Sequence, residues 1–177
     1  MDVVLDTNVW IDAACGFDQA PTLGGKLPQE ATAEFKMLWA LAHGVIAGVR
    51  LHGGEHLWRN IFRVLHDKWG WPEDQAAAWV GECRRLVVFT GGDPDVAASM
   101  DALRPSTVTA AQVRFGVEDA EDLTVVVLAR RAHARLVVSN DGGMCGLDTG
   151  DVRGATPGRF LQVAIALQEE AAASAAV

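Results

Sequence analysis

An apolar run near the start of the chain, VVLDTNVWID (Val3–Asp12), reaches Asp6 and then turns polar with Thr7 and Asn8. We interpret Met1–Leu5 as a buried strand. A carboxylate at the end of a buried strand is costly unless hydrogen bonds, a helix N-terminus or a metal ion compensate its charge. Any fold that this chain adopts must therefore compensate Asp6.

Strand-like and helix-like segments alternate after this first strand. Further strands are expected at Val45–His52, Leu86–Thr90 and Arg135–Ser139. Helices are expected at Ala31–His43, His56–Trp69, from about Pro72, at Asp119–Ala132 and after Pro157, with a short one at Asp101–Arg104 or Thr109–Val113. Gly16–Gln29 is rich in glycine and proline and predicts a long loop. This alternation predicts an α/β fold, a three-layer α/β/α sandwich around a mostly parallel sheet.

One late segment, LTVVVLA, is ambiguous between strand and helix. Its β-branched residues favour a strand by propensity. Acidic residues gather before it, and Arg130 and Arg131 follow it, which is the charge pattern of a helix. We therefore favour a helix.

Length and composition limit the classes of protein. The 177 residues suit a single domain, which we place at residues 1–168, followed by a low-complexity tail at 169–177 that we expect to fray. We expect no membrane span and no signal peptide. Three scattered cysteines favour a reducing compartment and hence the cytoplasm. A net charge of −8 disfavours coating nucleic acid by bulk charge, but it allows an enzyme that acts on it.

A second strand ends in polar residues in the same manner as the first. The segment RLVVSND brings Ser139, Asn140 and Asp141 directly after an apolar strand. In an open parallel sheet, ligands bind beyond the carboxyl ends of the strands. We therefore expect Asp6 and Asp141 to lie at the same edge of the sheet.

Two further acids begin the late helix. Asp119 and Asp122 are three residues apart and share a helix face. Carboxylates gathered in one place repel each other, so they raise one another's pKa or bind a cation. Hard divalent ions such as Mg²⁺ prefer oxygen ligands, and they support hydrolysis of phosphodiesters.

Each of these acids also has a purely structural interpretation. Asp119 and Asp122 form a pattern that caps a helix. Asp141 precedes two glycines, which is an ordinary turn signal. HGGEH (His52–His56) has two histidines, but Gly-Gly between them favours a strand end and a helix start over a zinc site.

Three blocks, VVLDTNVWID, EDLTVVVLARRAHARLVVSND and GATPGRFL, together resemble a PIN domain, the nuclease domain of many bacterial toxins. The resemblance implies a Mg²⁺- or Mn²⁺-dependent ribonuclease that acts on RNA, restrained by a small antitoxin protein and often paired as a homodimer. It implies metal-binding acids at Asp6, Asp122 and Asp141, with Asp119 as a further candidate. The same matches imply supporting roles for Thr7, Asn8, Ser139 and Asn140.

The chain departs from the family pattern at one position. The segment LWRNIFRVL has Asn60 where the family usually has a glutamate, and Glu55 near the helix start is a candidate substitute. Two interpretations stay open: an active site with fewer acids, or a degenerate domain that binds RNA or a protein without catalysis. A phosphohydrolase with an aspartyl nucleophile is a third, but Asn8 occupies the position where that chemistry needs an acid.

Overall fold

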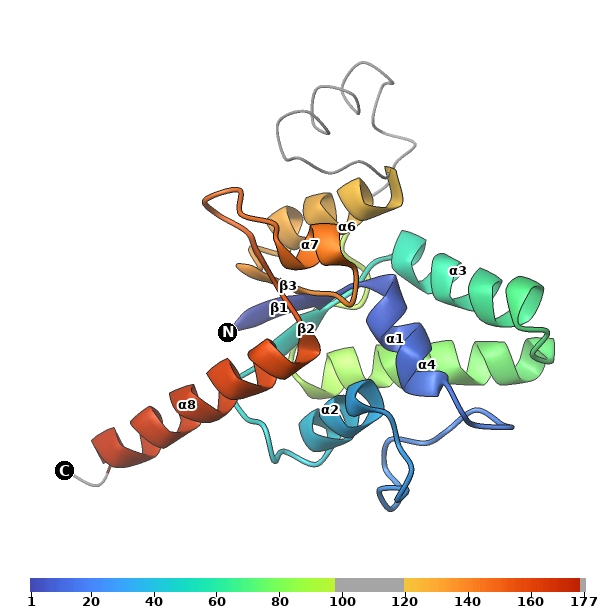
Figure 1. Ribbon diagram of the computed structural model, residues 1–177, viewed down its shortest axis with the longest axis horizontal. Coiled ribbons are helices and arrows are strands. Elements are labelled where there is room, and N and C mark those ends of the chain that lie inside the picture. Colours follow the sequence, from blue (N-terminus) through green and yellow to red (C-terminus); the bar gives the residue numbers. More distant parts are fainter. Residues whose placement is uncertain (98–119, 176–177) are drawn as a thin grey trace.

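A parallel sheet forms the centre of the molecule, as Figure 1 shows for the computed structural model, which describes residues 1–97 and 120–175. The strand order is β2-β1-β3-β4, and every described pairing is parallel. The strands are β1 (Asp2–Leu5), β2 (Arg50–His52), β3 (Leu136–Val138) and β4 (Arg153–Ala155). The prediction of a mostly parallel α/β sheet is confirmed.

Helices cover the sheet from both sides and make a three-layer sandwich (Figure 1). They are α1 (Thr7–Ala14), α2 (Ala33–Ala42), α3 (Glu55–Arg63) with a π-helical turn η1 (Val64–Lys68), α4 (Glu73–Phe89), α6 (Ala120–Arg131), α7 (Gly142–Cys145) and α8 (Pro157–Ala175). Helix α6 packs on β1 and β3, and α7 packs on β3 and β4. On the other side, α4 packs against β2.

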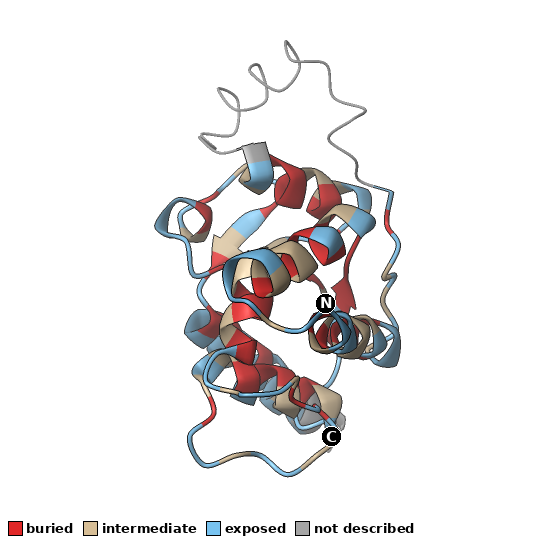
Figure 2. Ribbon diagram, turned by 90° about the vertical axis from the view of Figure 1, so that its right-hand side faces the viewer, coloured by how far each residue is buried: buried red, intermediate tan, exposed pale blue. Residues whose placement is uncertain are grey.

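Two of the largest buried side chains, Trp10 and Trp79, join β1, α1 and α4 through hydrogen bonds. The Trp10 indole nitrogen donates a hydrogen bond to the Leu5 carbonyl at 3.2 Å, and Trp79 donates to the Trp10 carbonyl at 3.1 Å. Burying an indole is favourable when its single polar hydrogen finds an acceptor. Figure 2 shows buried residues along the strands and the inward sides of the helices.

Most predicted elements are confirmed with shifted ends. The predicted helix Ala31–His43 corresponds to α2, and the predicted strand Arg135–Ser139 to β3. The ambiguous late segment is helical, as α6. The segment between α1 and α2 contains no helix or strand, as expected for Gly16–Gln29. The short helix expected at Asp101–Arg104 or Thr109–Val113 lies outside the described residues.

The predicted strand at Leu86–Thr90 is wrong, because this segment completes helix α4. Leu86 continues a buried helical stripe begun by Ala76, Trp79 and Cys83. Packing of that stripe against the core outweighs the β-propensity of the last residues, a weak preference that context overrides.

Two more differences concern short elements. Only the last three residues of the predicted strand Val45–His52 form β2. Strand β4 and the short helix α7 were not predicted. Gly154 of β4 runs so close to α7 that an added Cβ would lie 1.8 Å from the Met144 carbonyl oxygen, so glycine is required there.

The C-terminal helix extends beyond residue 168, where we placed the end of the domain. Helix α8 extends to Ala175, into the segment that we expected to fray. None of the helices in residues 1–97 and 120–175 has both the length and the apolar character needed to cross a bilayer.

Candidate active site

Asp6 lies at the carboxyl end of β1 and is the N-cap of α1. Its side chain is buried, with 4% exposed. The Thr7 backbone N–H donates to Oδ1 at 2.6 Å, and Oδ2 accepts from the Asn8 amide at 3.0 Å and from the Ser139 hydroxyl at 2.7 Å. The cost of burying this carboxylate is therefore offset by a helix N-terminus and by two side-chain donors.

Ser139 is the link between the first and third strands. Its fully buried hydroxyl donates to Asp6 and accepts from the Asn8 amide at 3.1 Å and from the Asp141 backbone N–H at 2.9 Å. One hydroxyl thus makes every hydrogen bond available to it. The structure thus brings together four residues that the sequence analysis singled out, at the edge where the parallel strands end: Asp6, Asn8, Ser139 and Asp141.

Asp141 follows β3 and is the N-cap of α7. Its Oδ1 accepts from the backbone N–H groups of Gly143 and Met144, at 2.8 and 3.1 Å. The structural interpretation of Asp141 is therefore correct as far as this oxygen is concerned. Oδ2 accepts no hydrogen bond from the residues that the structure describes. One carboxylate oxygen at this exposed position is left for another partner.

The two carboxylates influence each other. Burial raises the pKa of Asp6, and the negative charge of Asp141 raises it further, against the lowering effect of its hydrogen-bond donors. Burial also raises the pKa of the Cys145 thiol, and both Asp141 and Asp6 add to that shift. Negative charge is therefore disfavoured here, which is the condition under which a cation binds favourably.

Asn140 connects this centre to two acids that the sequence analysis missed. Its side-chain amide donates to Asp12 Oδ2 at 2.7 Å and to Glu34 Oε1 at 3.2 Å, and its backbone N–H donates to Asn8 Oδ1 at 3.1 Å. Asp12 is four residues after Asn8 on α1, so helical spacing could have placed it on the same face. No local signal pointed to Glu34.

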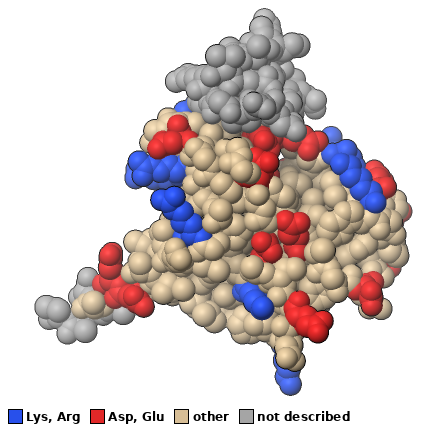
Figure 3. All heavy atoms as spheres, viewed as in Figure 1, with Lys and Arg blue, Asp and Glu red and all other residues tan. Residues whose placement is uncertain are grey.

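One face of the molecule carries side chains of both charges. Figure 3 shows Asp and Glu side chains in the middle of this face and also along its margins, where Lys and Arg side chains lie as well. Acidic side chains suit a cation, and basic side chains suit a phosphate backbone.

Asn60, where the resemblance to PIN domains led us to expect a glutamate, is 5% exposed and hydrogen-bonded to charged neighbours. Its amide nitrogen donates to Glu121 Oε2 at 3.0 Å, and its oxygen accepts from Arg63 at 2.8 Å. Arg63 also pairs with Glu121 Oε1 at 3.0 Å. The sequence analysis overlooked Glu121, which directly precedes the expected ligand Asp122 and brings a carboxylate to the neighbourhood of Asn60.

The other three predicted metal ligands are Asp122, Glu55 and Asp119. Asp122 is partly buried in the first turn of α6. Glu55 is exposed and pairs with Arg59 on its own helix, so its local contacts do not connect it with Asp6 or Asp141. Asp119 lies outside the described residues. Within residues 1–97 and 120–175, no three His, Cys, Asp or Glu side chains form a group that could hold a metal ion.

The residues at the sheet edge nevertheless have the right chemistry for Mg²⁺ or Mn²⁺. Mg²⁺ is usually held by one or two carboxylates and keeps several waters. Asp6 and Asp141 supply two carboxylates that repel each other, and Asp141 has an oxygen left over. The fit is therefore to a hydrated ion on two acids, a smaller ligand set than the sequence predicted.

Comparison of the chain with protein-family models gives no match, and a search of curated proteins also gives none.

Proposed function

We propose that this protein is a metal-dependent endoribonuclease of the PIN type, which hydrolyses phosphodiester bonds in RNA. The main support is the pair of Asp6 and Asp141 at the carboxyl ends of two neighbouring parallel strands. That edge is where open α/β sheets bind their ligands. A buried carboxylate kept close to a second one is unfavourable for stability, and binding a cation relieves that cost.

Within this proposal, Asp6 and Asp141 hold Mg²⁺ or Mn²⁺, Asp122 contributes from the start of α6, and Asp119 is a further candidate ligand. A bound ion of this kind supplies positive charge for the phosphate and activates water. Asn8 and Ser139 hold the Asp6 carboxylate in one orientation through the hydrogen bonds at its Oδ2.

Arg63 is the residue that we assign to the RNA backbone. Asn60 and Glu121 fix its guanidinium group, while 43% of its side chain stays exposed. A guanidinium ordered in this way can contact a phosphate and position the strand without reading its sequence. Asn60 would then help to position the RNA substrate through Arg63 instead of binding the metal.

The proposal extends to partners and location by analogy with the family. The protein would be the toxin of a toxin–antitoxin pair, working in the cytoplasm, held by a small antitoxin and pairing with a second copy. Support for a protein partner comes from Val163 and Leu167, two exposed apolar side chains that share one face of α8. Exposed apolar side chains that lie together often mark an interaction surface.

A degenerate PIN-like domain that binds RNA or a protein without catalysis is the second candidate. It is favoured by the engagement of Asn60 in a network with Arg63 and Glu121. The aspartyl-nucleophile interpretation still lacks the second acid that this chemistry needs, because Asn8 occupies its position.

The test is cleavage of a labelled mixed RNA pool by the purified protein, with Mg²⁺ or Mn²⁺, with EDTA, and with Asp6→Asn. Glu55→Gln is the matched control, since Glu55 is exposed and, among the described residues, pairs with Arg59 on its own helix. Cleavage that needs the metal, disappears in Asp6→Asn and persists in Glu55→Gln supports the nuclease. A folded protein that leaves the pool intact but binds Mn²⁺ in titration calorimetry points to a narrow target. One that does neither overturns the proposal in favour of the degenerate domain.

A further inference from the structure

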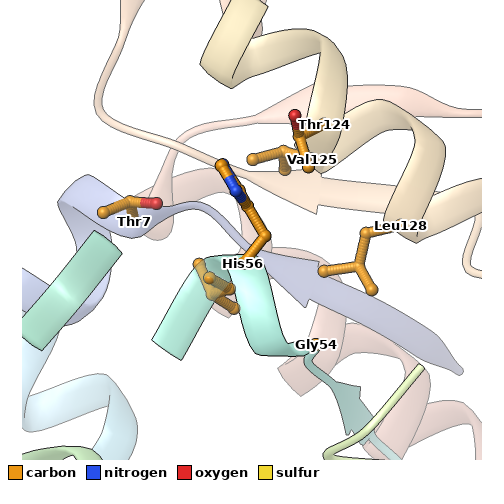
Figure 4. Close-up of a pocket in the computed structure, with 7 residues that line it drawn as sticks. Thr7, Gly54, His56, Thr124, Val125 and Leu128 are labelled. Carbon is orange, nitrogen blue, oxygen red and sulfur yellow. The ribbon is translucent and has the colours of Figure 1, made fainter. Parts of the chain in front are cut away.

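A small pocket lies between the start of α1, the start of α3 and helix α6 (Figure 4). Leu57, Val125 and Leu128 provide apolar walls. Its polar lining consists of the His56 imidazole and the hydroxyls of Thr7 and Thr124. The space in this pocket that is open to water is about 10 Å³, which is room for one water molecule.

Two of these polar groups are unpartnered. His56 Nε2 is buried and has no hydrogen-bond partner. The Thr7 hydroxyl has none within the part of the chain that the structure describes, although the Thr7 backbone N–H bonds to Asp6. In Figure 4 the Thr7 hydroxyl is directed toward the imidazole ring. Burying a polar atom without a partner is costly, so something is expected to satisfy the imidazole nitrogen.

We propose that one ordered water molecule occupies this pocket and bridges His56 Nε2 to the Thr7 hydroxyl. The buried Thr124 hydroxyl is its third polar neighbour. A buried water makes two to four hydrogen bonds to protein groups, and His56 and Thr7 supply two of them. Water both donates and accepts, so it satisfies the imidazole nitrogen in either neutral tautomer.

The water connects two elements that meet at the candidate active site. His56 belongs to α3, whereas Thr7 is the first residue of α1 and donates its N–H to Asp6. The bridge fixes the start of α1 relative to α3. This inference stands independently of the proposed nuclease activity, because it concerns only the pocket and its hydrogen bonds.

The direct test is a crystal structure of the full chain at a resolution that shows ordered water. The expected result is a density peak within about 3.2 Å of both His56 Nε2 and Thr7 Oγ1, the normal range for such hydrogen bonds. A pocket without density overturns the proposal. So does a direct hydrogen bond between His56 and Thr7, because that contact would satisfy both groups without water.

A second test uses thermal unfolding of Thr7→Val, His56→Phe and the double variant. Each single change is expected to lower Tm by about 2–4 °C, the shift that corresponds to one net hydrogen bond in a domain of this size. The double variant should lose little more than the larger single loss, because either change removes the bridge. Thr22→Val, at an exposed loop position, is the control. Fully additive shifts or unchanged melting would contradict the bridge.

Discussion

The Ser139 hydroxyl donates to Asp6 Oδ2 over 2.7 Å and so joins the ends of strands β1 and β3. The same hydroxyl accepts a hydrogen bond from the Asp141 backbone N–H. The Asp6 carboxylate therefore depends on Ser139 for its orientation and for part of the hydrogen bonding that compensates its buried charge.

Replacing Ser139 with alanine removes this link. We expect Ser139→Ala to lower the free energy of unfolding by about 1.5–3 kcal/mol, the contribution of a hydrogen bond to a charged group. Urea denaturation followed by circular dichroism measures the change. Because Ser139 is completely buried, an unchanged midpoint would show that the hydroxyl does not support Asp6.

The raised pKa of Asp6 gives its contribution to stability a definite sign. Between the ordinary value and the higher folded value, the native state binds more protons than the unfolded state, so stability from this group falls as pH rises. The cost is absent below about pH 3.8 and complete above the folded pKa. Asp6→Asn should therefore gain stability relative to the wild type as pH rises from 4 to about 7 in metal-free buffer.

Asp151 provides a control of opposite sign for that experiment. Its hydrogen bonds with Arg130 and Thr149 lower its pKa to about 2. Its contribution is present above the ordinary value and is lost as pH falls toward 2. Asp151→Asn should therefore lose stability relative to the wild type as pH rises from 2 to about 4. Parallel pH profiles for the two variants would contradict the assignment for Asp6.

Binding of a metal ion should offset the loss of stability that the buried Asp6 carboxylate causes. A ligand at one hundred times its dissociation constant stabilises the native state by roughly 2.7 kcal/mol. In a domain of this size that raises Tm by about 5–10 °C. We expect Mn²⁺ to do this for the wild type and for Glu55→Gln at pH 7, and to have little effect on Asp6→Asn or Asp141→Asn. Equal shifts in all four proteins would place the ion elsewhere.

The network around Asn60 predicts a rescue. Asn60→Asp keeps the side-chain volume but removes the donor to Glu121 and places a like charge beside it. We expect a loss of about 1–3 kcal/mol in the free energy of unfolding. Adding Glu121→Gln restores a donor and removes the repulsion, so the double variant should recover much of that loss. Additive losses in the double-mutant cycle would exclude direct coupling.

The sequence predicted the parts of this site that local patterns determine. Asp6 and Asp141 each follow an apolar strand, and the rule for parallel sheets was enough to bring them to one edge. The hydrogen bond from Ser139 to Asp6 spans 133 positions, yet it follows from the pairing of neighbouring strands. These features needed no knowledge of packing.

Other features depend on tertiary contacts that no local pattern encodes. Glu34 approaches Asn140 across 106 positions, and Glu121 approaches Asn60 across 61. The segment Leu86–Thr90 looked like a strand because its β-branched residues carry that propensity, whereas the partners of its buried stripe lie elsewhere in the chain. Strand β4 (Arg153–Ala155) contains glycine and alanine, which are depleted in strands, so no β-propensity marks it in the sequence.

The double use of Asp141 has a practical consequence. One of its oxygens accepts hydrogen bonds from the first amides of α7, so a cation that binds the other oxygen changes the charge across the whole carboxylate. The amides of Gly143 and Met144 are thus a built-in spectroscopic reporter. Their ¹H and ¹⁵N resonances would register cation binding at Asp141 without any label at the site, and would do so before a substrate is known.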